Sequence, residues 1–99
     1  MAIYFTPKAQ SDLIAIWEYI AEDNESVADA YISRIQTVCS LLESQPVMGV
    51  EREILTEKLR LMPFDKYNIY YLTHNPDVTI IRIRHSAQDP SALTLQGLS

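Results

Sequence analysis

The residues best suited to binding or catalytic chemistry lie in the second half of the chain: Arg60, Arg82, Arg84, His85 and Asp89. Guanidinium groups bind carboxylates and phosphates through paired hydrogen bonds. If the strands that carry the three arginines are neighbours in register, the arginines can line one patch of a sheet. Such a patch can hold an acidic segment of a partner protein or an RNA phosphate. The alternative is that each arginine pairs with a nearby acid and is otherwise solvated.

His85 lies at the end of the last run of strand-forming residues. An imidazole titrates near neutral pH, so it can act as a general acid or a general base. The simpler interpretation is that His85 terminates the strand and hydrogen-bonds locally, with Asp89 four residues further on as a candidate partner. We adopt this simpler interpretation and predict no catalytic residue.

The charge of the chain is unevenly distributed. The net charge is −5, and residues 1–50 carry two bases against seven acids, whereas residues 51–99 carry six of each. Binding to nucleic acid depends on neutralising phosphates, so a net acidic chain is not a general nucleic-acid binder. We therefore expect no direct sequence-specific binding to nucleic acid, although the basic residues are concentrated in the second half of the chain.

Several other kinds of site are not expected. Cys39 is the only cysteine and has apolar neighbours at helical spacing, which predicts a buried, reduced thiol. The acids Glu22, Asp23 and Glu25 form a loop cluster with no His or Cys nearby, so we predict no metal site and no cofactor. No stretch approaches the roughly 18 apolar residues of a membrane span and no signal peptide is evident, so we expect a soluble, cytoplasmic protein.

Two amphipathic helices are predicted in the first half. Thr6-Pro7 reads as a helix start, with the hydroxyl as N-cap. The helix should continue to about Ala21, with its acidic face, Asp12 included, in water. Asn24 or Ser26 can cap a second helix, which must end before Pro46. The apolar stripes of the two helices comprise Ala9, Leu13, Ile16, Trp17 and Ile20, and then Ala28, Tyr31, Ile32, Ile35, Val38, Cys39 and Leu42.

Strand patterns occupy the rest of the chain. Residues 2–6 are β-prone, residues 58–62 alternate, and residues 67–73 and 78–84 form a hairpin across four turn-prone residues. Alternation places Val78, Ile80, Arg82 and Arg84 on one face of the last strand. The fold class is therefore α+β, in the order β-α-α-β-β-β, with an antiparallel sheet and a helical hairpin packed on one face. Residues 1–99 form a single domain, with 90–99 as a C-terminal extension or loose tail.

The aromatic residues of these elements are expected to serve the core. Tyr67 and Tyr71 share one face of their strand, and Tyr70 points the other way. Trp17 is expected to anchor the first helix to the sheet.

Four stretches in this order resemble the ParE/RelE family of small bacterial toxins. They are DLIAIWEYIAEDN (12–24), Pro46-Val-Met-Gly49 followed by Arg52-Glu53, Leu59-Arg60 before Tyr67-Asn-Ile-Tyr70-Tyr71, and IIRIRHSAQD (80–89). The resemblance covers residues 3 to 89 and favours the ParE type. Gln88 departs from the family pattern, which has an arginine before the aspartate, and this removes one cation from the tail.

The resemblance implies a toxin of a type II toxin–antitoxin system. ParE-type members inhibit DNA gyrase by stabilising its cleaved DNA complex, and a cognate antitoxin neutralises them with a tail that folds onto the toxin. On this interpretation Arg60, Arg82, Arg84, His85 and Asp89 contact the antitoxin or the target. Charge reversal at Arg82 should then weaken the antitoxin complex by more than ~1 kcal/mol if the pair is buried.

Two alternatives remain open under the same resemblance. The first is a RelE-type ribosome-dependent mRNA endoribonuclease, in which His85 acts as acid or base and the arginines stabilise the charged phosphorane. The second is a degenerate family member that binds an antitoxin but is not toxic, which the Gln88 departure suggests.

Overall fold

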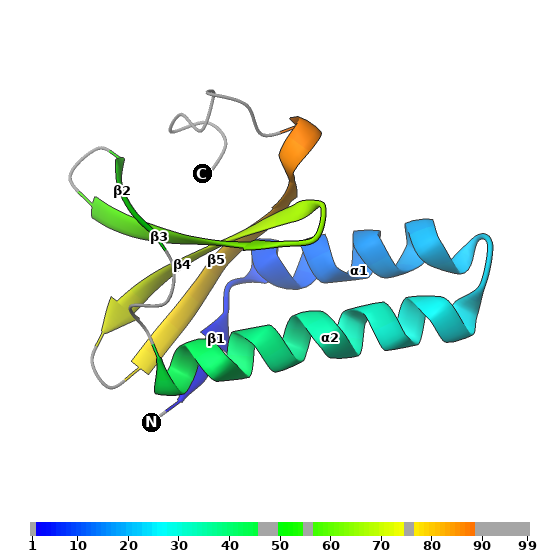
Figure 1. Ribbon diagram of the computed structural model, residues 1–99, viewed down its shortest axis with the longest axis horizontal. Coiled ribbons are helices and arrows are strands. Elements are labelled where there is room, and N and C mark those ends of the chain that lie inside the picture. The colour runs from blue at the N-terminus through cyan, green and yellow to red at the C-terminus, as the bar shows by residue number, and fades with distance from the viewer. Residues whose placement is uncertain (1, 46–49, 55–56, 75–76, 89–99) are drawn as a thin grey trace.

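The computed structural model describes residues 2–45, 50–54, 57–74 and 77–88, and within these ranges the chain forms two α-helices, five strands and a short 3-10 helix (Figure 1). In chain order the elements are β1 (Ile3–Phe5), α1 (Pro7–Ala21), α2 (Glu25–Ser44), β2 (Val50–Ile54), β3 (Glu57–Phe64), β4 (Tyr67–His74), β5 (Asp77–His85) and η1 (Ser86–Gln88). Within the described residues, no helix is long and apolar enough to cross a membrane.

Both helices begin at side-chain caps. The Thr6 hydroxyl accepts a hydrogen bond from the backbone N–H of Ala9 at 3.1 Å, and Pro7 occupies the first turn, as predicted. Asn24 caps α2 by accepting from the N–H of Val27 at 3.1 Å, so the alternative cap at Ser26 is wrong. The helices lie side by side as a hairpin that extends past the sheet in Figure 1.

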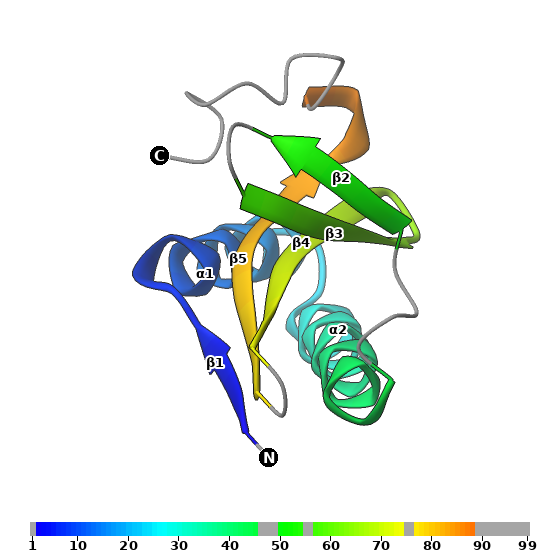
Figure 2. The same ribbon diagram turned by 90° about the vertical axis from the view of Figure 1, so that its left-hand side faces the viewer.

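The sheet has the strand order β1-β5-β4-β3-β2. The α+β class and the helical hairpin are confirmed, but the sheet differs from the prediction in two respects. First, β2 is an additional strand, paired antiparallel with β3. Second, β1 pairs with β5 in parallel, from Ile3 opposite Val78 to Phe5 opposite Ile80. The sheet is therefore mixed, and β1 lies at the outer edge of β5 (Figure 2). The segment between these two strands contains both helices, and so it is long enough to let them pair in parallel.

A β-bulge in β5 changes which side chains face the helices. Tyr71 lies opposite Ile80 whereas Tyr70 lies opposite Arg82, so Ile81 is the extra residue. The prediction that Arg82 shares the face of Val78 and Ile80 is therefore wrong. Strict alternation would place charged guanidinium groups in the apolar core, at a high desolvation cost. The bulge puts Ile83 there instead.

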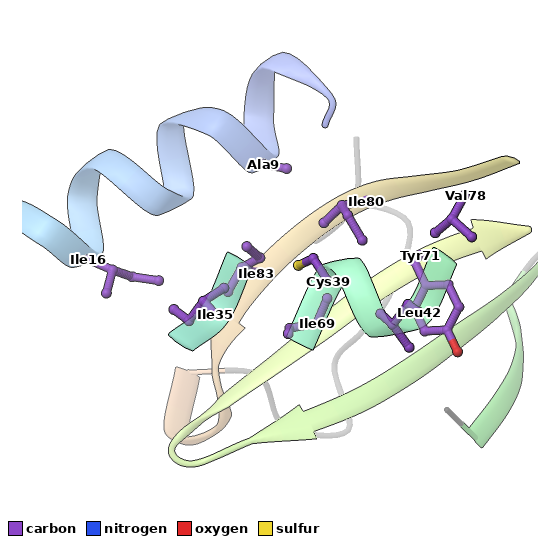
Figure 3. Packing of buried hydrophobic residues seen from close by; sticks show 10 residues of the cluster. All are labelled: Ala9, Ile16, Ile35, Cys39, Leu42, Ile69, Tyr71, Val78, Ile80 and Ile83. Atoms are coloured by element: carbon purple, nitrogen blue, oxygen red, sulfur yellow. The ribbon is translucent and has the colours of Figure 1, made fainter. Parts of the chain in front are cut away.

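The core lies between the helical hairpin and one face of β4 and β5. Figure 3 shows side chains of both helices directed toward those of the two strands. The fully buried members include Ile35, Cys39, Leu42, Ile69 and Tyr71. Burial raises the pKa of the Cys39 thiol to about 12, which keeps it protonated and unreactive. The predicted buried thiol is confirmed.

Two further predictions about aromatic residues can be compared with the structure. Tyr70 is 1% exposed and lies outside the helix-facing cluster that holds Tyr71, so the two tyrosines do point to opposite faces. Trp17 differs from the prediction. Its indole Nε1 donates to a carboxylate oxygen of Asp29 at 2.7 Å, so it joins α1 to α2 rather than to the sheet. The indole N–H needs an acceptor, and the helical hairpin supplies one.

Candidate functional site

Asp12 of α1 and Arg82 of β5 form the central contact at the open edge of the sheet. One Asp12 oxygen accepts from Arg82 Nε at 2.8 Å, and the other accepts from Nη2 at 3.1 Å. The first oxygen also accepts from the backbone N–H of Ile83 at 2.9 Å. The Arg82 and Asp12 side chains are only 17% and 15% exposed. The prediction that Asp12 lies on a solvated face is therefore wrong.

Asp12 lies beside the edge of β5 because the N-terminus of α1 is hydrogen-bonded to that strand. The backbone N–H of Thr6 donates to the carbonyl of Ile80 at 3.1 Å, and its hydroxyl donates to the carbonyl of Ile81 at 2.8 Å. Pairing between β1 and β5 ends at Ile80, so the next edge N–H of β5 needs another acceptor. Asp12 lies less than two helical turns after Thr6 and supplies that acceptor.

The structure brings together two of the three arginines singled out in the sequence. Arg82 and Arg84 lie opposite Tyr70 and Asn68, and both line the same pocket. Arg60 lies opposite Tyr71, whose side chain belongs to the helix-facing core, so its register places it on the other face of the sheet from Arg82. The predicted patch of three arginines is therefore not formed.

Three parts of the sequence prediction fall outside the described residues. They are Asp89, the loop at 46–49 that contributes to the family resemblance, and the expected tail at 90–99. Gln88 is the last residue of η1 and closes the described part of the chain.

His85 is held by local contacts, as the simpler interpretation predicted, whereas its candidate partner Asp89 lies outside the described residues. Its Nδ1 accepts from the backbone N–H of Ala87 at 3.0 Å. Its ring packs edge-on against Tyr67, with centroids 5.2 Å apart and an interplanar angle of 80°. Because Nδ1 is the acceptor, the proton of the neutral ring is assigned to Nε2, which becomes a donor.

An aromatic cluster ties α2 to the β3–β4 turn. The Tyr31 hydroxyl donates to Asp65 at 2.8 Å, and its ring packs edge-on against Phe64 and Tyr67 at 5.7 and 6.0 Å. The Arg34 guanidinium lies 5.3 Å from the centre of the Phe64 ring, in cation–π range. Burial, followed by the hydrogen bond to Asp65, raises the pKa of Tyr31 well above its ordinary value, so the phenol remains neutral.

The β3–β4 turn is short, and its conformation was not anticipated. Phe64 pairs with Tyr67, so only Asp65 and Lys66 connect the strands. Asp65 has φ of 53°, in the left-handed region that Asp tolerates better than most residues. The turn brings the Asp65 carboxylate within hydrogen-bonding distance of Tyr31 of α2.

The two helices, the β3–β4 turn and β5 line a pocket of about 630 Å³ that opens to solvent. It lies between residues 12–20 of α1, Tyr31 of α2, the β3–β4 turn and the end of β5. The pKa of Tyr67, in its wall, is raised by burial and then by its neighbours Tyr19 and Asp65, so this phenol also stays protonated. Among the described residues, no group of three or more His, Cys, Asp or Glu side chains could hold a metal ion.

Sequence reasoning found only part of this pocket. It identified Arg82, Arg84 and His85, but missed six further polar or aromatic wall residues: Asp12, Tyr19, Tyr31, Asp65, Lys66 and Tyr67. A signal for Asp12 was present. It lies three residues after the buried Ala9 and directly before Leu13 of the apolar stripe, so it borders the buried face of α1.

Comparison with known proteins gives the family. Residues 3–90 match the family described as "ParE toxin of type II toxin-antitoxin system, parDE". The chain is 30% identical over 79 residues to Toxin ParE3 of Caulobacter vibrioides, in an alignment that covers 79% of each protein. A chain of the structure described as "Chromosomal ParDE TA system from P. aeruginosa" superposes with a TM-score of 0.72, over 86% of this chain and 95% of that one. At 20% identity, the structural likeness supports the fold. The family match spans most of the chain, and the chain therefore belongs to the ParE toxin family of type II toxin–antitoxin systems.

Proposed function

We propose that this protein inhibits DNA gyrase by stabilising the cleaved gyrase–DNA complex, and that a cognate antitoxin neutralises it in the cytoplasm. The toxin would bind a surface of gyrase that is preferentially exposed in the cleaved state and so shift the cleavage–religation balance. On this account the chain is a binding protein, and its side chains recognise partners rather than carry out a reaction.

The Asp12–Arg82 pair supports a binding role more than a nuclease role. An endoribonuclease must stabilise the extra negative charge that develops on the attacked phosphate, which requires cations directed at that phosphate. Arg82 is instead held by both oxygens of Asp12, with each side chain less than a fifth exposed. Its charge is largely neutralised within the protein, so it is poorly placed to stabilise a phosphorane.

The proposed antitoxin contact follows from the same region. Disordered antitoxin tails can fold onto a toxin surface and add a strand or a helix to it. Candidate contact residues for the antitoxin or the target are Arg60, Arg82, Arg84, His85 and Asp89. Arg82, Arg84 and His85 lie together around the pocket, whereas the register separates Arg60 from them.

One observation keeps the endoribonuclease as a second candidate. The His85 imidazole contacts the Tyr67 ring, and Tyr31 and Arg84 line the same pocket. These are groups that can move protons and bind phosphate. The two candidates differ in what purified protein does: gyrase-catalysed supercoiling falls on the first, and ribosome-dependent mRNA cleavage appears on the second. Unimpaired supercoiling together with mRNA cleavage would overturn the gyrase proposal.

A further inference from the structure

The pocket at the end of the sheet has the size of a recognition site. Its volume of about 630 Å³ falls within the ~300–1,000 Å³ typical of pockets that bury a small ligand. Two adjacent side chains of a bound peptide fit within such a volume. The walls come from four separate parts of the chain, so the fold, and not one flexible loop, sets its shape.

The charge of the pocket is opposite to that of the protein as a whole. The described lining residues include three bases, Lys66, Arg82 and Arg84, and two acids, Asp12 and Asp65. The two acids already accept hydrogen bonds, Asp12 from β5 and Asp65 from Tyr31. The pocket therefore has a local excess of positive charge in a chain whose net charge is −5. Such an excess favours an anionic ligand.

Two of the lining residues, Lys66 and His85, carry cationic or donor groups and lie on segments that are joined at one side of this pocket. The backbone N–H of Ser86 donates to the carbonyl of Lys66 at 2.8 Å, which joins the end of β5 to the β3–β4 turn. This bond holds the backbone of Lys66 beside the strand end that carries His85. The Nδ1 atom of His85 accepts from Ala87, which leaves Nε2 as the donor. An ammonium and an imidazole N–H that line the same pocket are both donors that a carboxylate can accept from.

The remaining wall is aromatic and aliphatic. Tyr19 is 74% exposed at the rim, and Ile16, Ile20 and Tyr67 lie deeper. An exposed tyrosine beside a partly apolar pocket is typical of an anchor point in a protein interface. The ligand that fits both walls is a carboxylate directly followed by a bulky apolar side chain.

We propose that this pocket binds an acidic peptide segment of the antitoxin, with one Asp or Glu carboxylate between Lys66 and His85 and the adjacent aromatic or aliphatic side chain against Tyr19 and Tyr67. The identity of the partner rests on the proposed function, whereas the chemistry of the ligand rests on the pocket alone. A mononucleotide fits less well, because the Asp65 carboxylate in the wall repels the double charge of a phosphate dianion more strongly than the single charge of a carboxylate.

The test uses two blocked dipeptides as probes, N-acetyl-Asp-Trp-amide and N-acetyl-Asn-Trp-amide, titrated into the ¹⁵N-labelled full chain and followed by NMR. The Asp probe should shift amides of the β3–β4 turn and the end of β5 with a millimolar Kd, in the range of about 4 kcal/mol of binding free energy at 1 mM. The Asn probe should bind about fivefold more weakly, because it lacks the charge.

Two variants and their matched controls locate the site. Lys66→Met and Tyr19→Ala should each weaken the Asp probe about three- to tenfold, as expected for loss of one charge contact or one aromatic anchor. Lys8→Met and Tyr4→Ala change the same residue types at exposed positions that do not line the pocket, and should leave the Kd unchanged.

Three outcomes would overturn this proposal: equal binding of the two probes, absence of shifts at pocket amides, or tighter binding of adenosine 5′-monophosphate than of the Asp probe at the same amides. Gyrase supercoiling measured on the same sample separates the two proposals. Selective Asp-probe binding without gyrase inhibition keeps the acidic-peptide pocket and overturns the proposed function. Gyrase inhibition without selective binding overturns the pocket and keeps the function.

Discussion

Asp12 of α1 holds both the guanidinium of Arg82 and the backbone N–H of Ile83 with a single carboxylate. This contact closes the edge of β5 beyond the point where β1 stops pairing. It also pairs Arg82, one of the three arginines singled out in the sequence, with an acid of the same chain. Arg82 therefore contributes first to stability. A substitution of Arg82 can weaken partner binding by destabilising the fold as well as by removing a contact at the interface.

Replacing Asp12 with alanine should lower the free energy of unfolding by about 2–3 kcal/mol, because it leaves a largely buried guanidinium and a strand-edge N–H without their acceptor. Urea denaturation measures the loss. Glu18→Ala, an exposed acid on the same helix, is the control and should cost no more than about 0.5 kcal/mol. Equal losses for the two variants would show that the Asp12 contacts do not matter for stability.

Arg82→Glu should destabilise the fold more than Arg84→Glu in urea unfolding, because the carboxylate introduced at the first position would face that of Asp12.

A double-mutant cycle over Asp12→Ala and Arg82→Ala should give a coupling energy of about 1–2 kcal/mol in urea unfolding. Additive effects of the two substitutions would contradict the pairing. Antitoxin affinity measured only on folded fractions then tells whether Arg82 also lies in the interface.

Alkaline pH should destabilise the protein, and the first contribution should come from Cys39, whose thiol loses its proton in the unfolded chain. In the unfolded chain a thiol loses its proton near the ordinary pKa of 9.0, whereas burial raises the pKa of the folded thiol to about 12. Between these values the unfolded state binds fewer protons, so stability is complete below pH 9 and falls as pH rises toward 12. The slope is at most about 1.4 kcal/mol per pH unit.

Cys39→Ala provides the comparison for this pH dependence. The variant should retain only the loss due to its tyrosines, whose ordinary pKa is 10.0 and whose folded pKa values are raised at Tyr31 and Tyr67. The decline in its unfolding free energy should therefore begin about one pH unit later than in the parent chain. Urea unfolding at half-unit intervals from about pH 8 to about pH 11 tests this shift, and identical onsets would contradict it.

Tyr31→Phe should cost about 1 kcal/mol of stability, since it removes the hydrogen bond to Asp65 but keeps the ring contacts with Phe64 and Tyr67. Tyr4→Phe, at a residue that is 54% exposed, is the matched control and should be neutral. Thermal or urea unfolding distinguishes them. A neutral Tyr31→Phe would mean that the hydroxyl does not hold the turn against α2.

His85→Ala should leave growth arrest and gyrase inhibition intact, because on our account the imidazole contacts the antitoxin rather than a substrate. Induced expression in a sensitive host, scored by colony counts with and without the antitoxin, checks this. The variant should need more antitoxin for rescue. Loss of arrest by a variant whose circular dichroism spectrum and unfolding are unchanged would favour the nuclease.

Much of the fold follows from local patterns in the sequence. The caps at Thr6 and Asn24 and the apolar stripes of α1 and α2 are local signals, and the structure confirms them except at Trp17. The bulge at Ile81 is not local, because it depends on the partner strand and on the cost of burying Arg82. β2 was missed because its residues, Val50–Ile54, are mostly charged and carry no apolar alternation.

The pocket was harder to predict than the fold for a similar reason. Its wall joins Asp12, Tyr31, Asp65 and His85, which are brought together only by tertiary packing. Composition did show that the bases gather in the second half of the chain. It could not show that one base, Arg82, pairs with an acid 70 residues earlier. Contacts across such separations depend on topology and not on sequence spacing.

The most direct test of the central claim is gyrase-catalysed supercoiling of relaxed plasmid with purified protein, scored on the same gel for linearised DNA. We predict that supercoiling falls while linear DNA accumulates, and that adding the antitoxin before the toxin prevents both effects. Unimpaired supercoiling, with no linear DNA, by a folded protein that still arrests growth would contradict gyrase inhibition.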